Sequence, residues 1–226
     1  MVFKTYVDKH VRSTTKFKSA EELLKNSKPT IFVWICFGIG ALISLLAVSG
    51  MDMNAQPGYE GSEAFVKFLL WVAFTVFFGM VPAWITGIVL KIKLNHRMKA
   101  QRSRPAADIN PHELVAFLNA NLQYLSPYLV NWKYIAGGDK HDDAVTCKFT
   151  KKTNIVITFG TNYEGQRFYQ ISARKASVIK YVVLSGSGLG AGNTNAGFGE
   201  YSCLYKSTPI LTAAMEYYLK GLGDKA

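Results

Sequence analysis

The stretch FLLWVAFTVFFGMVPAWITGIVL, from Phe68 to Leu90, decides the fold together with IFVWICFGIGALISLLAV, from Ile31 to Val48. Neither run contains a charged residue. A helix of about 20 apolar residues crosses the ~30 Å hydrocarbon core of a bilayer, so each run is long enough for one crossing. Inside lipid the backbone N–H and C=O groups must pair within the segment, which favours helices. The runs therefore predict a transmembrane helical hairpin.

The charges beside the runs predict how the hairpin is oriented. Residues 1–29 and 67–104 are rich in Lys and Arg, whereas the loop 49–63 contains acids and no base. By the positive-inside rule both termini lie in the cytoplasm and the loop faces outward. We therefore expect a multi-pass protein of a bacterial inner membrane. The bases after the second run are expected to lie at the membrane surface and to contact lipid; they are Lys91, Lys93, Arg97, Lys99, Arg102 and Arg104.

The formal net charge of +11 would also suit a nucleic-acid-binding protein. Most of this excess lies beside the apolar runs, where it sets topology, so no nucleic-acid partner is expected. The three cysteines form no C-x-x-C pair, and an odd count on a reducing side predicts free thiols rather than disulfides.

The chain divides into four expected regions. Residues 1–29 are a basic cytoplasmic segment, 30–91 the hairpin, 92–109 a basic linker, and 110–226 a cytoplasmic domain. The first segment has two interpretations: an amphipathic helix on the membrane surface, or a mobile basic tail. Within it, Ser19 and Glu22 have capping-box spacing, which predicts a short helix before Pro29.

The cytoplasmic domain begins with a capped helix. Asn110 is a good N-cap, Pro111 suits the first helical position, and apolar residues then recur at helical spacing until near Pro127. Beyond this helix the period changes to two, which predicts strands. The expected strands are 144–150, 154–161, 166–173 and 178–184, with 199–205 as a possible edge strand.

A last helix is expected from Pro209 to Lys220, with Ser207 or Thr208 as its N-cap and Gly221 as its stop. The fold class expected is thus a two-span transmembrane α-hairpin followed by a cytoplasmic α+β domain. Its antiparallel sheet has four to five strands, and both helices pack on one face. The fragment from about Ala106 to Ala226 is expected to fold without the hairpin.

The second run carries Gly79, Ala83 and Gly87 at four-residue spacing, which places small side chains along one helix face. This stripe either packs the two spans of one hairpin together or lets a partner's helix, or a second copy of the chain, approach closely. A homo-oligomer through the second span is therefore one possibility.

A glycine-rich stretch, SGSGLGAGNTNAGFG from Ser185 to Gly199, is the second candidate site. Gly186, Gly188 and Ala191 match a loose dinucleotide-binding pattern, but the residues that follow are poor helix formers, so no phosphate site is predicted. A flexible loop and a partner-binding loop remain the alternatives. The residues of the possible partner loop are Gly186, Gly188, Gly190, Gly192, Asn193, Asn195 and Gly197.

No hydrolase, zinc-protease or phosphate-loop motif occurs, so no catalytic residue and no cofactor is expected. His141, Asp142 and Asp143 lack further residues at ligand spacing, so a solvated turn is favoured over a metal site.

The order of a basic tail, a hairpin with Met51 and Met53 in its loop, and a cytoplasmic α+β domain resembles the entry-exclusion proteins of I-type conjugative plasmids. The resemblance covers the whole chain in layout and size, without a fingerprint motif. It implies a non-enzymatic inner-membrane protein that blocks redundant DNA transfer by recognising a conjugation component. The alternatives are a membrane-anchored scaffold or assembly subunit of a secretion or envelope complex, and a membrane-bound enzyme.

Overall fold

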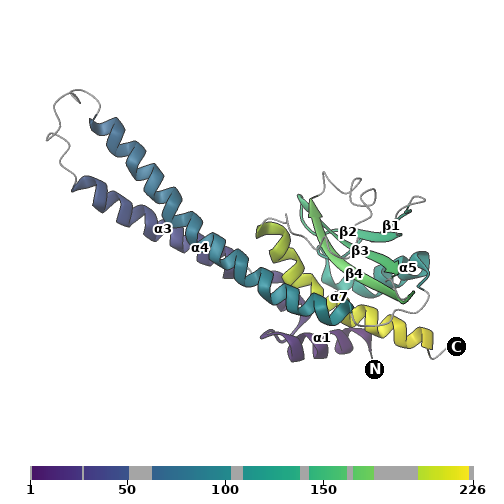
Figure 1. The fold of residues 1–226 in the computed structure, drawn as a ribbon. Coiled ribbons are helices and arrows are strands. Elements are labelled where there is room, and N and C mark those ends of the chain that lie inside the picture. The colour runs from purple at the N-terminus through teal and green to yellow at the C-terminus, as the bar shows by residue number, and fades with distance from the viewer. Residues whose placement is uncertain are drawn as a thin grey trace. The chain divides into compact units, whose positions relative to one another are not determined.

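The structure is a computed structural model that describes residues 2–26, 28–50, 63–102, 109–137, 143–161, 165–175 and 198–223. The chain forms two compact units: Met1–Asn26 with Leu90–Ala226, called here the α+β unit, and Ser27–Val89, called the helical unit. Figure 1 labels the helices, which are α1 (Phe3–Thr14), α2 (Ala20–Lys25), α3 (Lys28–Ser49), α4 (Glu63–Arg102), α5 (Pro111–Leu122), the 3-10 helix η2 (Gln123–Leu125) and α7 (Phe198–Gly223). The strands are β1 (Lys133–Ile135), β2 (Ala144–Lys148), β3 (Thr153–Thr161) and β4 (Arg167–Lys175).

The α+β unit is built on a four-stranded antiparallel sheet in the order β1-β2-β3-β4. Val145 on β2 lies opposite Ile157 on β3, which lies opposite Ile171 on β4. Because side chains alternate between the two faces of a strand, these three share one face of the sheet. All three are fully buried, so this face forms part of the core.

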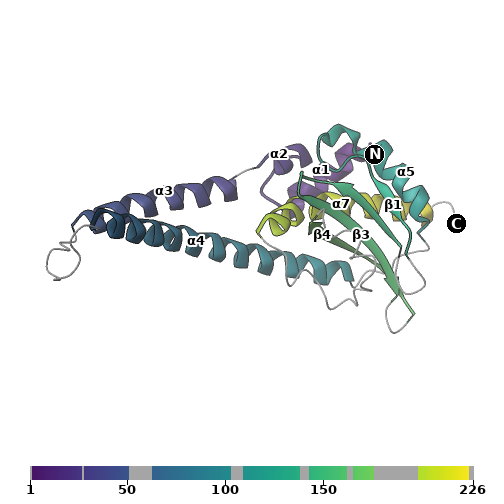
Figure 2. The ribbon, with the colours of Figure 1, turned by 90° about the horizontal axis from the view of Figure 1, so that it is seen from above.

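Helices α5 and α7 cover that face of the sheet (Figure 2). Helix α5 contacts β1 and β2 through Leu114, Leu118 and Leu122, which recur every four residues and are fully buried. Helix α7 contacts β3 and β4. The predicted α+β class, with an antiparallel sheet and helices on one face, is confirmed.

The start of α5 follows its predicted cap. The Asn110 side chain accepts a hydrogen bond from the backbone N–H of His112 (3.0 Å), and Pro111 is the first helical residue. The helix ends at Leu122, where the chain tightens into η2, a few residues before the predicted end at Pro127.

Helices α1 and α2 pack on the outer side of α7, which lies between them and the sheet (Figures 1 and 2). Phe3, Val7 and Val11 are buried on α1, as are Leu23 and Leu24 on α2. Neither interpretation of residues 1–29, a membrane-surface helix or a mobile tail, therefore describes α1. Its apolar stripe is buried by protein, and residues 1–26 belong to the α+β unit.

Aromatic rings join this N-terminal pair of helices to the rest of the unit. The Phe3 ring meets Tyr217 of α7 at 5.2 Å and Phe117 of α5 at 5.5 Å, both edge-to-face. At the other end, Lys206 Nζ on α7 donates to the carbonyl of Leu24 at 3.0 Å, which satisfies a carbonyl in the last turn of α2. The cap of α2 is as predicted, since the Ser19 hydroxyl accepts from the N–H of Glu22 (3.2 Å).

Helix α7 corrects two predictions. Residues 199–205, expected as an edge strand, are helical, and the helix continues through Pro209 to Gly223 rather than starting there. An interior proline removes one backbone hydrogen bond and crowds the carbonyl four residues earlier. Burial on both sides of Pro209 outweighs this cost; the buried residues of α7 include Cys203, Leu204, Ser207, Ile210, Leu211, Ala214 and Met215.

The strand predictions were right for β2, β3 and β4 to within two residues at each end. Strand β1 was missed because it is only three residues long, which is too short for an alternating pattern. Its position depends on contacts with helix α5. The Asn119 side chain of α5 exchanges two hydrogen bonds with the backbone of Trp132, at 2.8 and 3.0 Å, directly before β1. The predicted strand 178–184 lies outside the described residues.

The helical unit contains α3 and the first part of α4. The Trp71 indole N–H on α4 donates to the backbone carbonyl of Ala41 on α3 at 3.0 Å. A Cβ at Gly40 would lie 2.7 Å from Cβ of Phe78, so the helices approach closely at this glycine. Among the described residues, one helical stretch, Phe65–Lys93, is long and apolar enough to cross a membrane, while Phe37–Ser49 is apolar but shorter.

The expected linker 92–109 is helical for most of its length, because α4 continues to Arg102. Residues 91–102 contain neither glycine nor proline, and seven of these twelve residues are Lys, Arg, Leu or Met, which are good helix formers. The apolar run ends near Leu90, but nothing in the sequence stops the helix there.

Candidate functional site

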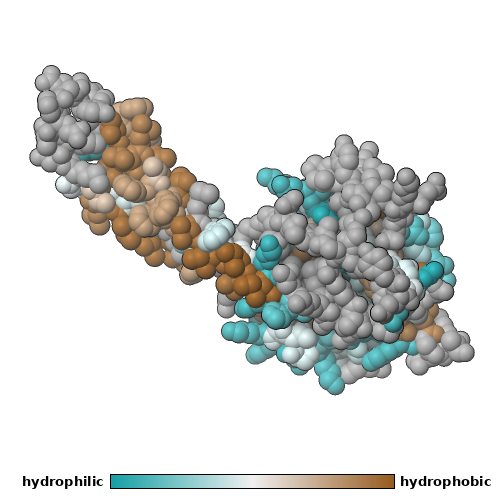
Figure 3. All heavy atoms as spheres, viewed as in Figure 1, coloured by the Kyte–Doolittle hydropathy of each residue, from teal (hydrophilic) through white to brown (hydrophobic). Residues whose placement is uncertain are grey.

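The most distinctive surface of the chain is the apolar surface of α3 and α4. Every large hydrophobic side chain that is strongly exposed among the described residues lies on these two helices, apart from Val2. Trp34, Leu46 and Trp84 are each at least 70% exposed. Figure 3 shows hydrophobic residues, in brown, along much of these two helices. Apolar area in water costs about 25 cal/mol per Å², so a surface of this kind needs an apolar environment.

The small-residue stripe on α4 is divided between two environments. A side chain at Gly79 would overlap the Phe37 ring of α3, whereas a Cβ at Gly87 would meet nothing within 4 Å. Ala83 lies on α4 between them. Gly79 therefore lies where α4 comes close to α3, whereas Gly87 faces no described atom at that distance. Both alternatives for the stripe stay predictions.

The basic residues expected at the membrane surface lie mostly on the last part of α4. The backbone of this helix includes Lys91, Lys93, Arg97, Lys99 and Arg102, and Arg104 falls outside the described residues. Lys93 is exposed and Lys91 is partly exposed.

The possible partner loop lies entirely within residues 176–197, outside the described part of the chain. This holds for Gly186, Gly188, Gly190, Gly192, Asn193, Asn195 and Gly197. Of the predicted turn, His141 and Asp142 also lie outside the described residues, whereas Asp143 is described. Its carboxylate accepts hydrogen bonds from the Tyr134 hydroxyl (2.8 Å) and the Gly137 N–H (2.9 Å). Asp143 thus stabilises the connection from β1 to β2, and its hydrogen bond raises the pKa of Tyr134.

A polar cluster that the sequence did not predict lies where α1 meets α7. Glu216 on α7 accepts a hydrogen bond from the Tyr6 hydroxyl (3.3 Å), and its carboxylate lies 3.8 Å from Nδ1 of His10. Lys220 Nζ lies 3.4 Å from the Tyr6 hydroxyl and 5.3 Å from the centre of its ring. Helix α1 contributes Tyr6 and His10, and α7 contributes Glu216 and Lys220. In each helix the two residues are four positions apart, which places both on one face. That spacing was the only sign of the cluster in the sequence, because Tyr6 and Glu216 are 210 residues apart and no local pattern joins them.

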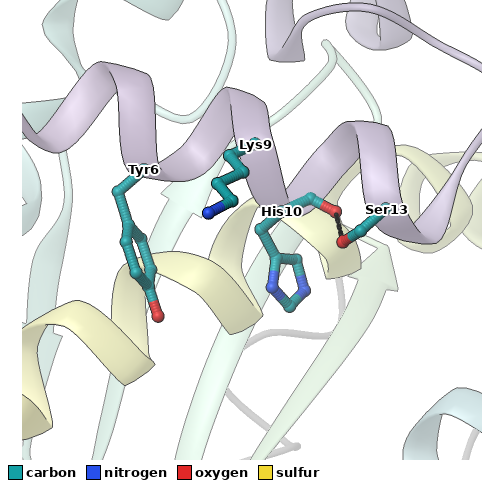
Figure 4. Close-up of a pocket in the computed structure, with 4 residues that line it drawn as sticks. All are labelled: Tyr6, Lys9, His10 and Ser13. Carbon is teal, nitrogen blue, oxygen red and sulfur yellow. Dashed lines mark hydrogen bonds between the residues drawn. The ribbon is translucent and has the colours of Figure 1, made fainter.

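Beside this cluster, α1 carries a pocket of about 240 Å³ lined by Tyr6, Lys9, His10 and Ser13 (Figure 4). The four side chains come from successive turns of one face of the helix. The Ser13 hydroxyl donates to the carbonyl of His10 at 2.8 Å, and Lys9 is exposed. The described residues that line the pocket are a cation, an imidazole and two hydroxyls, and none of these four is an acid.

The two described cysteines, Cys147 and Cys203, are buried free thiols in the α+β unit. Burial raises the pKa of Cys203 to about 11 and also raises the pKa of Cys147. Both thiols therefore stay protonated and unreactive near neutral pH. Among the described residues, no three His, Cys, Asp or Glu side chains gather in a way that would hold a metal ion.

Neither cysteine should react with iodoacetamide at pH 7.5 in the folded protein, because only a thiolate attacks and both thiols are shielded. A Cys36→Ala variant removes the third cysteine, and mass spectrometry counts the labels. Labelling should become complete in urea and, in native buffer, should rise only as the pH approaches 11. Rapid labelling of Cys203 at pH 7.5 would mean that α7 does not bury it.

Comparison with protein-family models, with curated proteins and with solved structures finds no match to this chain.

Proposed function

We propose that the chain is an integral membrane protein in which α3 and α4 cross the bilayer as a hairpin. The observation that carries this proposal is the exposed apolar surface of these two helices. Lipid tails would cover that surface at no cost in hydrophobic free energy. Helix α3 has 22 residues, enough for one crossing at ~1.5 Å per residue.

The core of the α+β unit supports the same topology. Residues 3–25 and the segments after residue 109 share one hydrophobic core, so they must occupy the same side of any membrane. The chain between them must then cross an even number of times. With α4 as one span, a second crossing is required, and α3 is the apolar helix available for it. By the positive-inside rule the shared side is the cytoplasm.

The biochemical role proposed is non-enzymatic recognition, with plasmid entry exclusion as the assignment. The layout of an intracellular α+β unit on a membrane hairpin supports this role, as does the resemblance to entry-exclusion proteins. In this role the protein would act in a recipient cell and recognise a component of an incoming conjugation apparatus. The partner would therefore be a protein, with lipid as the surrounding medium.

A mating experiment tests this role directly. Recipient cells expressing the chain should accept an I-type conjugative plasmid at least tenfold less often than cells with an empty vector. The matched control is an unrelated conjugative plasmid, whose transfer should be unchanged. Equal transfer of both plasmids, at a verified level of membrane-inserted protein, would favour the scaffold alternative. Crosslinking in membranes would then identify the complex that the protein serves.

A further inference from the structure

The pocket on α1 has the composition of an anion-binding site. Of the basic residues on α1, Lys4 pairs with Glu21 at 3.0 Å and Arg12 Nε donates to the Lys18 carbonyl at 2.7 Å. Lys9 makes no hydrogen bond or ion pair with any other described residue. Its ammonium group therefore lies at the pocket with its charge uncompensated by the described part of the chain.

A carboxylate outside the pocket positions two of the side chains that line it. Glu216 does not line the pocket but interacts with two residues that do, at 3.3 Å from the Tyr6 hydroxyl and 3.8 Å from Nδ1 of His10. A carboxylate in this position orients the imidazole. Glu216 thus holds Tyr6 by a hydrogen bond and lies close to His10, which keeps these walls of the pocket in place for a ligand.

The volume of the pocket indicates the size of the ligand. About 240 Å³ is several times the ~30 Å³ share of a water molecule, which leaves room for a phosphate group with a few attached carbon atoms. The Tyr6 ring and the carbon chain of Lys9 give the walls an apolar component suited to those carbons.

We propose that this pocket binds the phosphate and glycerol of an anionic phospholipid headgroup, with Lys9 and His10 holding the phosphate. The choice of a lipid rests on the proposed membrane insertion. Only residues 26 and 27 separate α2 from the start of α3. The unit that contains α1 is therefore tethered directly at the point where the apolar chain begins.

The test uses the full-length protein in lipid nanodiscs made of phosphatidylcholine alone or with added phosphatidylglycerol. Mass spectrometry measures how fast acetic anhydride acetylates Lys9, relative to Lys18, an exposed lysine outside the pocket. A bound headgroup should slow modification of Lys9 about fivefold in the phosphatidylglycerol discs, corresponding to roughly 1 kcal/mol for one basic contact. The ratio should not change in phosphatidylcholine discs.

Two variants separate a pocket from a general attraction of basic residues to the membrane. Ser13→Phe fills the pocket without changing any charge and should abolish the protection of Lys9. Lys16→Ala removes an exposed charge outside the pocket and should leave that protection intact. Both positions are solvent-accessible, so neither change should unfold the protein.

Equal slowing of Lys9 and Lys18, unaffected by Ser13→Phe, would overturn the proposal in favour of diffuse attraction. Protection of Lys9 by millimolar inorganic phosphate in phosphatidylcholine discs would overturn the lipid assignment in favour of a soluble phosphate compound. Incorporation into discs is measured separately by size-exclusion chromatography. A failure of membrane insertion is therefore distinguishable from a failure of headgroup binding.

Discussion

Removal of residues 1–26 should unfold the α+β unit, although these residues precede the sheet by more than 100 positions. Five large apolar side chains leave the core with this segment: Phe3, Val7, Val11, Leu23 and Leu24. At about 2 kcal/mol for each buried side chain, the loss is about 10 kcal/mol. A domain of this size has a total stability of only ~5–15 kcal/mol. The fragment 109–226 alone should therefore aggregate or give no cooperative thermal transition, in contrast to the expectation from the sequence that the chain after about Ala106 folds on its own.

A joined protein provides the control. Residues 1–26 connected to residues 109–226 by a flexible Gly/Ser linker of about 20 residues, which spans ~25 Å on average, should restore a cooperative melt. Within the joined protein, Val7→Asp should unfold the unit again, while Thr5→Asp, at an exposed position of the same helix, should have little effect. A cooperative melt of the fragment 109–226 at the temperature of the joined protein would contradict this account of the core.

Gly40→Leu should separate α3 from α4. The added Cβ would lie 2.7 Å from Cβ of Phe78, with the backbone of Phe78 within 3.8 Å, so the new side chain has no room unless the helices move apart. Overpacking of this kind costs ~1–3 kcal/mol, and the movement would also break the Trp71–Ala41 hydrogen bond. Titration of the full-length protein in mixed micelles with dodecyl sulfate should show a lower unfolding midpoint.

The matched control for this variant is Gly38→Leu, two residues earlier on the same helix. A Cβ at Gly38 meets nothing within 4 Å, so the leucine should be accommodated with little change in the midpoint. Gly79→Leu on α4 should behave like Gly40→Leu, and an added Phe37→Ala should relieve its effect because Phe37 is the residue it meets. Equal effects of the Gly38 and Gly40 variants would mean that the two helices do not pack at Gly40.

The sequence predicted elements whose signals are local. The cap at Asn110, the leucine spacing of α5 and the alternation of β2 to β4 each depend on a few neighbouring residues, and each was found near its predicted place. In the same way, the absence of charge in the two apolar runs was enough to predict α3 and α4 as helices.

The prediction for residues 1–29 failed because their apolar pattern suits more than one kind of packing surface. Phe3, Val7 and Val11 recur every four residues, and this spacing suits a membrane surface as well as it suits a protein surface. The choice depends on α7, which offers Tyr217 more than 200 residues later. The polar cluster of α1 and α7 was missed for the same reason, because Glu216 reaches Tyr6 and His10 only once α1 is packed on α7.

The continuation of α7 through Pro209 was a different kind of failure. Alternating residues and a proline predicted a strand followed by a helix start, and both signals are local. Burial of Cys203, Leu204 and Ser207 before the proline overrides them, because the helix places these side chains in the core. Tertiary packing, which a local pattern does not contain, decided the structure here.

The most direct test of the proposed hairpin is a map of membrane topology in living bacteria. Single cysteines are placed beside Met1, at Gly58 and beside Ala226, in a chain whose own three cysteines are replaced, and are treated with a thiol reagent that does not cross the inner membrane. We expect labelling at Gly58 in intact cells, and labelling at both termini only after the membrane is opened. Labelling of one terminus but not the other in intact cells would contradict the hairpin, because residues 3–25 and 109–223 would then lie on opposite sides of the membrane.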